Sequence, residues 1–246
     1  MAATKSTVKQ LQDFGQSVWL DYLRRNFVTG GDLKRLIDED GLRGVTSNPA
    51  IFEKAIAGST DYTEALQTLE RTRDQDAMTI YEHLAIPDIQ MAADALRPVY
   101  EETAGRDGYV SMEVSPYLAH DTQGSITEAR RLWSTIDRPN VMIKIPASAE
   151  GIPAIRQLIS EGLNVNITLL FGLERYEEVI EAYISGLEQL AGQRSGDLGG
   201  VASVASFFVS RVDTAVDAAI EEKLKQPGGQ EATLKGLLGK VAIANA

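Results

Sequence analysis

The chain has 246 residues, 43% of them hydrophobic, and is therefore large enough to bury the core of an ordinary globular protein. Its formal net charge of −11 repels nucleic acid and anionic membranes, which excludes broad polyanion binding and leaves any phosphate to a local cation. The sequence has no cysteine and only two histidines, His83 and His120, which excludes disulfides and thiolate chemistry and leaves a metal site poorly supplied with ligands.

Six short apolar runs, each bounded by Gly, Pro, Asp or Asn, alternate with longer stretches of helical periodicity. The expected strands cover residues 17–23, 44–48, 109–116, 141–147, 164–171 and 200–209. The expected helices cover residues 31–40, 125–136, 153–161, 173–190, 211–225 and 231–244, with a break at 226–229 before the last. This alternation is typical of βα units around a parallel sheet, so we predict an α/β fold.

The interval between the second and third expected strands is too long for one crossover helix. Two amphipathic stretches in it, near residues 61–82 and 86–103, indicate a helical insertion at about 53–105. The sequence has no repeat or low-complexity tract, so residues 1–246 are interpreted as a single domain. The first residues lack the apolar core of a signal peptide and no run is long enough to cross a membrane, which predicts a cytoplasmic protein.

Polar side chains gather on one face of every expected strand. Because successive side chains of a strand alternate between its two faces, each run divides into an apolar face and a polar-bearing face. The apolar faces hold Val45, Val110, Met112, Val114, Val141, Ile143, Ile145, Val165, Ile167 and Leu169. The polar-bearing faces hold Asp21, Thr46, Asn48, Ser111, Glu113, Lys144, Asn164, Asn166, Thr168, Ser206 and Phe208.

A barrel accounts for this division, because its outer side packs under helices while its lumen can carry polar groups. The active sites of such barrels lie at the C-terminal ends of the strands. An acid, Asp21, a base candidate, Glu113, and an amine, Lys144, are therefore expected to converge on one pocket.

Lys144 is the most informative of these residues, because it is the only charge in the apolar run VMIKIP. A buried ammonium is costly without a partner, and a lysine driven toward its neutral form is a nucleophile for carbonyl groups. The alternative is that Lys144 caps the strand and extends its amine to solvent. The run alone does not decide between the two interpretations.

The other candidates also have structural interpretations. Asp21 could cap the helix that follows the first strand, and Glu113 could simply neutralise Lys144 as a buried ion pair. The polar residues in 164–168 could end the sheet ladder with local turn bonds, and Arg211 could be a surface residue of the following helix. Together these interpretations would leave many polar groups in one barrel interior without a use, which favours a functional site.

Six segments resemble transaldolase, in the same order and at compatible spacing over nearly the whole chain. They are WLDYL, GVTSNPAIFEKAI, VSMEVSPYLAHDT, VMIKIPAS, NVNITLLFG and ASFFVSRVD. The resemblance implies a TIM (β/α)8 barrel of the class I aldolase type, of which only six strands are visible in this chain. It also implies a transferase of the pentose phosphate pathway that needs no metal or cofactor. Such an enzyme moves a dihydroxyacetone unit between sugar phosphates through a lysine Schiff base.

Carried over by motif, the resemblance gives the catalytic candidates their roles. Lys144 would attack the C2 carbonyl of sedoheptulose 7-phosphate or fructose 6-phosphate. Asp21 would remove the C4 hydroxyl proton as the C3–C4 bond breaks. Glu113, with Thr168 and a bound water, would shuttle protons during carbinolamine formation and dehydration.

The remaining matches concern substrate binding. Asn48 and Asn166 match the amides that hold the hydroxyls of the dihydroxyacetone moiety until glyceraldehyde 3-phosphate or erythrose 4-phosphate arrives. Ser206 and Arg211 match residues on the phosphate side, where a guanidinium suits bidentate contacts. Phe208 resembles an apolar wall of the same pocket.

The chain departs from the family pattern after the sixth expected strand, where a complete barrel needs two further βα units. We expect either a fragment of a longer transaldolase or missing strands supplied by a partner, with the first and sixth strands as unpaired edges. Two alternative functions stay open, a fructose 6-phosphate aldolase that releases free dihydroxyacetone and an inactive, truncated sugar-phosphate binder. Glu113 and Phe208 resemble transaldolases rather than that aldolase. The oligomeric state is not predicted.

Overall fold

The computed structural model describes residues 6–70, 76–193, 198–225 and 228–246. All six expected strands are present, each somewhat shorter than expected, and they form one parallel sheet in chain order. They are β1 (Trp19–Asp21), β2 (Gly44–Thr46), β3 (Tyr109–Glu113), β4 (Val141–Pro146), β5 (Val165–Leu170) and β6 (Ser203–Phe207). Among the described strands β1 pairs with β2 alone and β6 with β5 alone, so both are edges of the sheet.

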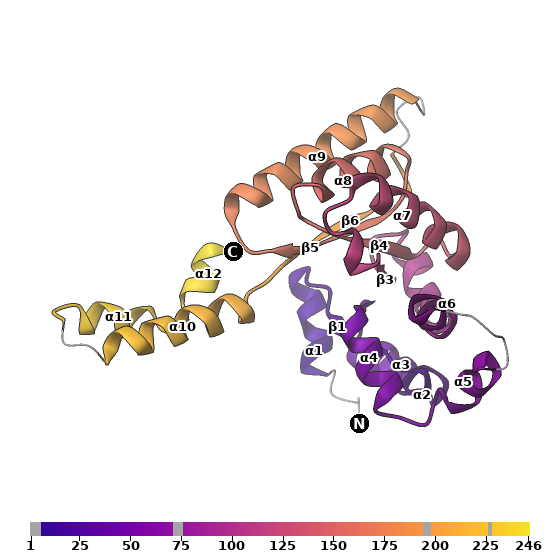
Figure 1. Ribbon diagram of the computed structural model, residues 1–246, viewed down its shortest axis with the longest axis horizontal. Coiled ribbons are helices and arrows are strands. Elements are labelled where there is room, and N and C mark those ends of the chain that lie inside the picture. The colour runs from indigo at the N-terminus through magenta and orange to yellow at the C-terminus, as the bar shows by residue number, and fades with distance from the viewer. Residues whose placement is uncertain (1–5, 71–75, 194–197, 226–227) are drawn as a thin grey trace.

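The sheet curls, and helices that follow the later strands pack along it, as Figure 1 shows for the magenta and orange part of the chain. These helices are α7 (Thr122–Ile136), α8 (Gly151–Ser160) and α9 (Leu173–Gln193). They agree with the three helices expected there, at residues 125–136, 153–161 and 173–190, to within about three residues at each end. The α/β prediction is therefore confirmed, with six parallel strands and their helices in the arrangement of a TIM-barrel-type fold.

The core lies on the apolar face of the sheet, under the helices. All the residues predicted for the apolar face are buried except one, Leu169. Leu169 has a φ of 62° and is 42% exposed, at the point where the register between β5 and β6 shifts between Ile167 and Leu170. As at a β-bulge, this irregularity interrupts the alternation of the strand, so the Leu169 side chain is exposed instead of packed in the core.

The described part of the interval between β2 and β3 holds three helices, α4 (Pro49–Ala57), α5 (Thr63–Glu70) and α6 (Ala77–Glu102). Helix α4 was not predicted from the sequence. The prediction of two helices separated near residues 82–86 was wrong, because α6 continues through Pro87. Residues of α6 on both sides of Pro87 belong to one buried stripe, and this packing offsets the backbone hydrogen bond that proline cannot donate. Residues 71–75 of the expected helix at 61–82 lie outside the described residues.

Short helical elements complete the N-terminal half and the loop after β3. They are α1 (Thr7–Gln10), η1 (Leu11–Phe14), α2 (Arg25–Thr29), α3 (Asp32–Arg35), η2 (Leu36–Asp40) and η3 (Pro116–Leu118). The helix expected at 31–40 is present as α3, which continues into the wider π-helical turn η2.

The C-terminal helices α10 (Ser210–Leu224), α11 (Glu231–Leu237) and α12 (Val241–Asn245) extend away from the sheet, as the yellow part of Figure 1 shows. The single helix expected at 231–244 is thus two helices, separated near Gly239, whose φ of 66° is left-handed. Residues 226 and 227 of the expected break lie outside the described residues. The Asn245 side chain donates to the Phe171 carbonyl at 2.7 Å and so ties α12 to the end of β5.

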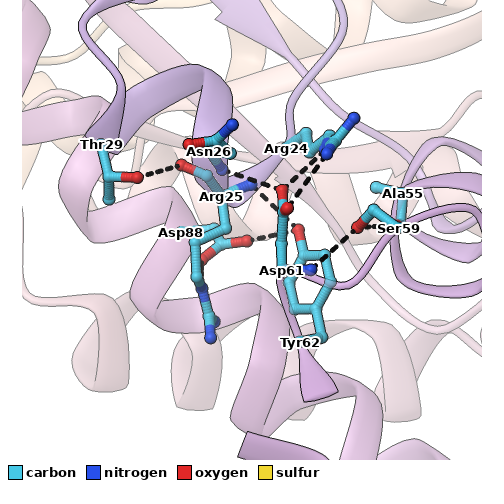
Figure 2. A network of polar contacts seen from close by, with 9 residues as sticks. All are labelled: Arg24, Arg25, Asn26, Thr29, Ala55, Ser59, Asp61, Tyr62 and Asp88. Carbon is cyan, nitrogen blue, oxygen red and sulfur yellow. Dashed lines mark hydrogen bonds and ion pairs between the residues drawn. The ribbon is translucent and has the colours of Figure 1, made fainter. Parts of the chain in front are cut away.

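A polar network holds the segment after β1 against the insertion (Figure 2). Asp88 of α6 is 0% exposed, and its carboxylate accepts from Arg25 Nε at 2.8 Å and from the Tyr62 hydroxyl at 2.7 Å. Burial raises the pKa of Asp88, whereas Arg25 and Tyr62 lower it. Next to it, Arg24 makes a bidentate pair with Asp61, at 2.6 and 3.0 Å. Two ion pairs therefore fix the chain immediately beyond Asp21.

Replacing Asp88 with alanine is expected to lower the free energy of unfolding by about 3–5 kcal/mol, because it leaves the Arg25 guanidinium without its buried partner. Urea denaturation followed by circular dichroism measures this loss. The matched control is Asp94→Ala on the same helix, which breaks the bidentate pair with Arg138 but removes a side chain that is 55% exposed. The control should cost less than about 1 kcal/mol, and equal losses for the two variants would contradict the prediction.

Candidate active site

Lys144 lies in the middle of the sheet and its side chain is almost completely buried. Its side chain is 7% exposed, and Nζ lies 3.4 Å from Thr46 Oγ1, 3.4 Å from the Ser47 carbonyl oxygen and 3.7 Å from Glu113 Oε2. These contacts come from the end of β2 and from β3, which places the amine across three neighbouring strands. The interpretation of Lys144 as a strand cap that extends to solvent is therefore excluded.

Glu113 is the register partner of Lys144 on the neighbouring strand, so their side chains share one face of the sheet. Burial raises the pKa of the Glu113 carboxyl most strongly, while Lys144 and Arg211 lower it and Asp21 raises it. The carboxyl consequently keeps its proton to higher pH than an exposed glutamate. At 3.7 Å the pair with Lys144 is an ion pair without a short hydrogen bond, so both groups can still exchange protons with a ligand.

Asn166 of β5 is the register partner of Lys144 on its other side. Its amide nitrogen donates to Ser111 Oγ at 2.9 Å, and its amide oxygen accepts from Ser206 Oγ at 2.8 Å. This chain of bonds joins β3, β5 and β6 and fixes which way the amide points. Thr168, two residues further along the same face, is 1% exposed. Asn166, Ser206 and Thr168 therefore lie on the predicted face.

Asn164, by contrast, supports the sheet. Its amide nitrogen donates to the carbonyls of Pro139 and Val141, and its oxygen accepts from the Ala202 amide. From the sequence alone, the polar residues of 164–168 could also end the sheet ladder with local bonds. That interpretation holds for Asn164 but not for Asn166.

Asp21, Asn48 and Arg211 line one cleft of about 420 Å³ beside the ends of β1 and β2. Asp21 is exposed and does not cap α2, whose N-cap is Arg24 without a side-chain bond. Asn48 does cap α4, because its side-chain oxygen accepts from the Ile51 amide at 2.9 Å. Its side-chain nitrogen is then the part of Asn48 that a ligand could use.

Phe208 and Arg211 lie together at the junction of β6 and α10. The Phe208 ring stacks on Phe171, with centroids 5.0 Å apart and an interplanar angle of 16°, and the Arg211 guanidinium carbon lies 4.4 Å from the Phe208 centroid. The aromatic ring thus supports the cation from one side. Arg211 is exposed in the cleft and also acts electrostatically on Glu113, so it is not merely a surface residue of the helix.

Two residues that act on the Lys144–Glu113 pair, Thr46 and Tyr81, were not predicted as site residues. Thr46 was placed on the polar-bearing face of its strand, and this signal was sufficient to find it, since its hydroxyl contacts Lys144. Tyr81 of α6 has no such signal in the sequence. Burial raises the pKa of its hydroxyl, and Glu113 is the next largest cause, so the phenol lies in the field of that carboxyl.

A larger hollow, of about 650 Å³, lies between α8 and α9 but is a poorer candidate for an anionic substrate. Four glutamates and one cation, Arg156, line it.

Within the described residues, no three His, Asp or Glu side chains gather in a way that could hold a metal ion. Among the helices that the structure describes, none is long and apolar enough to cross a membrane.

Comparison with known proteins identifies similar chains. A family model described as "Transaldolase/Fructose-6-phosphate aldolase" matches residues 18–242. The chain is 49% identical over 239 residues to "Transaldolase" of Trichodesmium erythraeum, a match covering 96% of this chain and 62% of that protein. It is 48% identical over 240 residues to "Transaldolase 2" of a Nostoc species, covering 96% and 62%. It is 49% identical over 243 residues to "Transaldolase" of Saccharopolyspora erythraea, covering 99% and 63%. The chain therefore spans less than two thirds of the length of these relatives.

Proposed function

Because the chain belongs to the transaldolase/fructose-6-phosphate aldolase family, we propose that it is a transaldolase that moves a dihydroxyacetone unit from a ketose phosphate to an aldose phosphate. The observation that carries the proposal is the buried Lys144, with its amine 3.7 Å from the Glu113 carboxylate and Asn166 on the adjacent strand. In this arrangement the amine of Lys144 can form a Schiff base, the Glu113 carboxyl can exchange protons with it, and the Asn166 amide can hold substrate hydroxyls beside it.

The reaction begins when the Lys144 amine attacks the C2 carbonyl of the ketose, which is fructose 6-phosphate or sedoheptulose 7-phosphate. Glu113 donates the proton with which the carbinolamine hydroxyl leaves as water, and Thr168 supports the water that carries this proton. The iminium that results draws the electron pair of the C3–C4 bond into an enamine. The raised pKa of Glu113 suits it to the donor role at neutral pH.

Asp21 takes the proton of the C4 hydroxyl as that bond breaks, so that C4 leaves as the aldehyde carbon of glyceraldehyde 3-phosphate or erythrose 4-phosphate. Asn48 and Asn166 hold the hydroxyls of the remaining three-carbon enamine. The enamine then adds to the carbonyl of the incoming aldose, which takes the proton back from Asp21. Hydrolysis of the new iminium frees Lys144 and releases the product ketose.

Ser206, Phe208 and Arg211 belong to the phosphate side of the pocket in this proposal. A guanidinium can give two parallel N–H bonds to a phosphate, and the stacked rings of Phe208 and Phe171 limit its orientation. The overall charge of −11 makes such a local cation necessary, because the field of the whole chain opposes a phosphate.

The test is consumption of fructose 6-phosphate with and without erythrose 4-phosphate. A transaldolase needs the acceptor and yields glyceraldehyde 3-phosphate and sedoheptulose 7-phosphate. Release of free dihydroxyacetone without an acceptor would instead show a fructose 6-phosphate aldolase. Binding of fructose 6-phosphate without turnover and without a borohydride-reducible adduct would show an inactive binder.

The pH dependence of folding gives a separate check on Glu113. A carboxyl whose pKa is raised on folding contributes stability below its ordinary pKa of 4.5, and this contribution is lost as the pH rises through the raised value. Glu113→Gln cannot ionise, so it should gain stability relative to the parent protein as the pH rises from about 5 to about 8. Urea unfolding at each pH measures the difference. Glu53→Gln, at an exposed position of α4, is the control for replacing a glutamate by glutamine outside the site.

A further inference from the structure

The wall of the cleft formed by α4 presents one cation on a surface of small side chains. Ala50, Ile51, Lys54, Ala55 and Gly58 line the cleft, and their spacing puts them on one stripe of the helix. Of these five residues only Ile51 and Lys54 have large side chains. Lys54 is exposed, and among the described residues no ion pair or side-chain hydrogen bond engages its amine.

Arg24 lines the same cleft and is held in place from behind. Its Nε and Nη2 donate to the two Asp61 oxygens, at 2.6 and 3.0 Å, and Asp61 in turn accepts from the Asn26 amide at 3.1 Å (Figure 2). This bidentate pair uses one edge of the guanidinium, Tyr22 also interacts with Arg24, and no second carboxylate among the described residues pairs with it. The Arg24 side chain is 34% exposed, so part of it stays accessible to a ligand in the cleft. Asp61 does not line the cleft itself.

Three cations, Arg24, Lys54 and Arg211, therefore line a cleft in which, among the described residues, Asp21 is the only carboxylate. In a chain with a net charge of −11 this local excess of positive charge is unusual and favours an anion. We infer that Lys54 and Arg24 contact the phosphate of the sugar phosphate, so that the phosphate is held between α4, the segment after β1, and Arg211. The inference rests on the proposed function for its ligand.

A structural role for Lys54 predicts a different result. The residue lies in the last turn of α4, where a cation also stabilises the helix dipole. A helix-stabilising lysine would affect all ligands alike when it is removed, whereas a phosphate contact would affect only phosphorylated sugars. Dihydroxyacetone is the matched ligand, because it can form the same Schiff base but has no phosphate.

The experiment measures the concentration of each sugar that gives half-maximal borohydride trapping. Lys54→Gln should raise this concentration for fructose 6-phosphate about tenfold, the loss expected for one charge-assisted bond, and leave dihydroxyacetone unchanged. Lys54→Arg keeps the cation and should stay within about threefold of the parent protein. Arg24→Gln should resemble Lys54→Gln. The control is Lys34→Gln, at a lysine of α3 that pairs with Asp38 away from the cleft.

The inference is overturned if Lys54→Gln leaves fructose 6-phosphate trapping unchanged, or if it weakens trapping of both sugars equally. Should the parent protein trap neither sugar, the proposed function fails, and titration with inorganic phosphate then decides about the cleft. Weaker phosphate binding by Lys54→Gln than by the parent and Lys34→Gln supports the inference. Equal binding by all three proteins, or no binding by any, overturns it.

Discussion

Replacing Lys144 with alanine is expected to abolish both sodium borohydride trapping with fructose 6-phosphate and transfer of the dihydroxyacetone unit. The amine lies at the centre of the polar face, with Glu113 and Asn166 as its register partners, and no other lysine of the described chain lies in that sheet. Removal of a covalent nucleophile lowers turnover by a factor on the order of 10⁴ or more. Mass spectrometry of the reduced adduct measures trapping, and a coupled assay of glyceraldehyde 3-phosphate measures turnover.

Two further variants separate loss of the nucleophile from loss of charge. Lys144→Arg keeps a cation beside Glu113, but a guanidinium stays protonated and does not form the imine, so this variant should be as inactive as the alanine one. Lys34→Ala removes an exposed lysine of α3 and should trap normally. An adduct of parental yield on the Lys144→Ala protein would refute the Schiff-base assignment.

The strands could be predicted from the sequence more reliably than the helices of the insertion. Each strand is a short apolar run with clear boundaries, and its alternation depends only on local geometry. The course of α6 depends instead on tertiary packing, because Pro87 breaks the local pattern while the buried stripe continues past it. α4 was missed for a related reason. It begins directly after β2 with Asn48 as its cap, and the sequence TSNPAIF gives a strand signal almost to that point.

The centre of the site could likewise be predicted, but its rim could not. Alternation within each strand is enough to put Glu113, Lys144 and Asn166 on the polar-bearing face, and the observed register then makes them neighbours. The positions of Arg24 and Lys54 depend on how the insertion folds back over the ends of β1 and β2. No periodicity encodes that contact. The bidentate pair between Arg24 and Asp61 joins residues 37 positions apart in the chain.

Asp21 is expected to act after the Schiff base has formed, which makes its effect separable from that of Lys144. It lies at the end of β1, exposed in the cleft, and influences Glu113 electrostatically without any direct bond to Lys144 among the described contacts. Asp21→Asn keeps the shape of the side chain but cannot take a proton. Trapping with fructose 6-phosphate should then remain within about threefold, while release of glyceraldehyde 3-phosphate should fall by about 10²–10⁴-fold, the usual contribution of a general base.

Comparison of adduct formation with aldehyde release in one protein sample isolates the bond-breaking step. The control is Asp32→Asn on α3, where the exposed carboxylate lies 3.7 Å from Arg35. This variant should change neither adduct formation nor aldehyde release. If Asp21→Asn lowered trapping and cleavage by the same factor, Asp21 would serve imine formation instead. Because Asp21 raises the pKa of Glu113, removing its charge should also lower that pKa. With a lower pKa, less of the Glu113 carboxyl is protonated as the pH rises, so any loss of trapping that acts through Glu113 should increase with pH. The loss of cleavage should persist at every pH, because Asp21→Asn cannot take the proton at any pH.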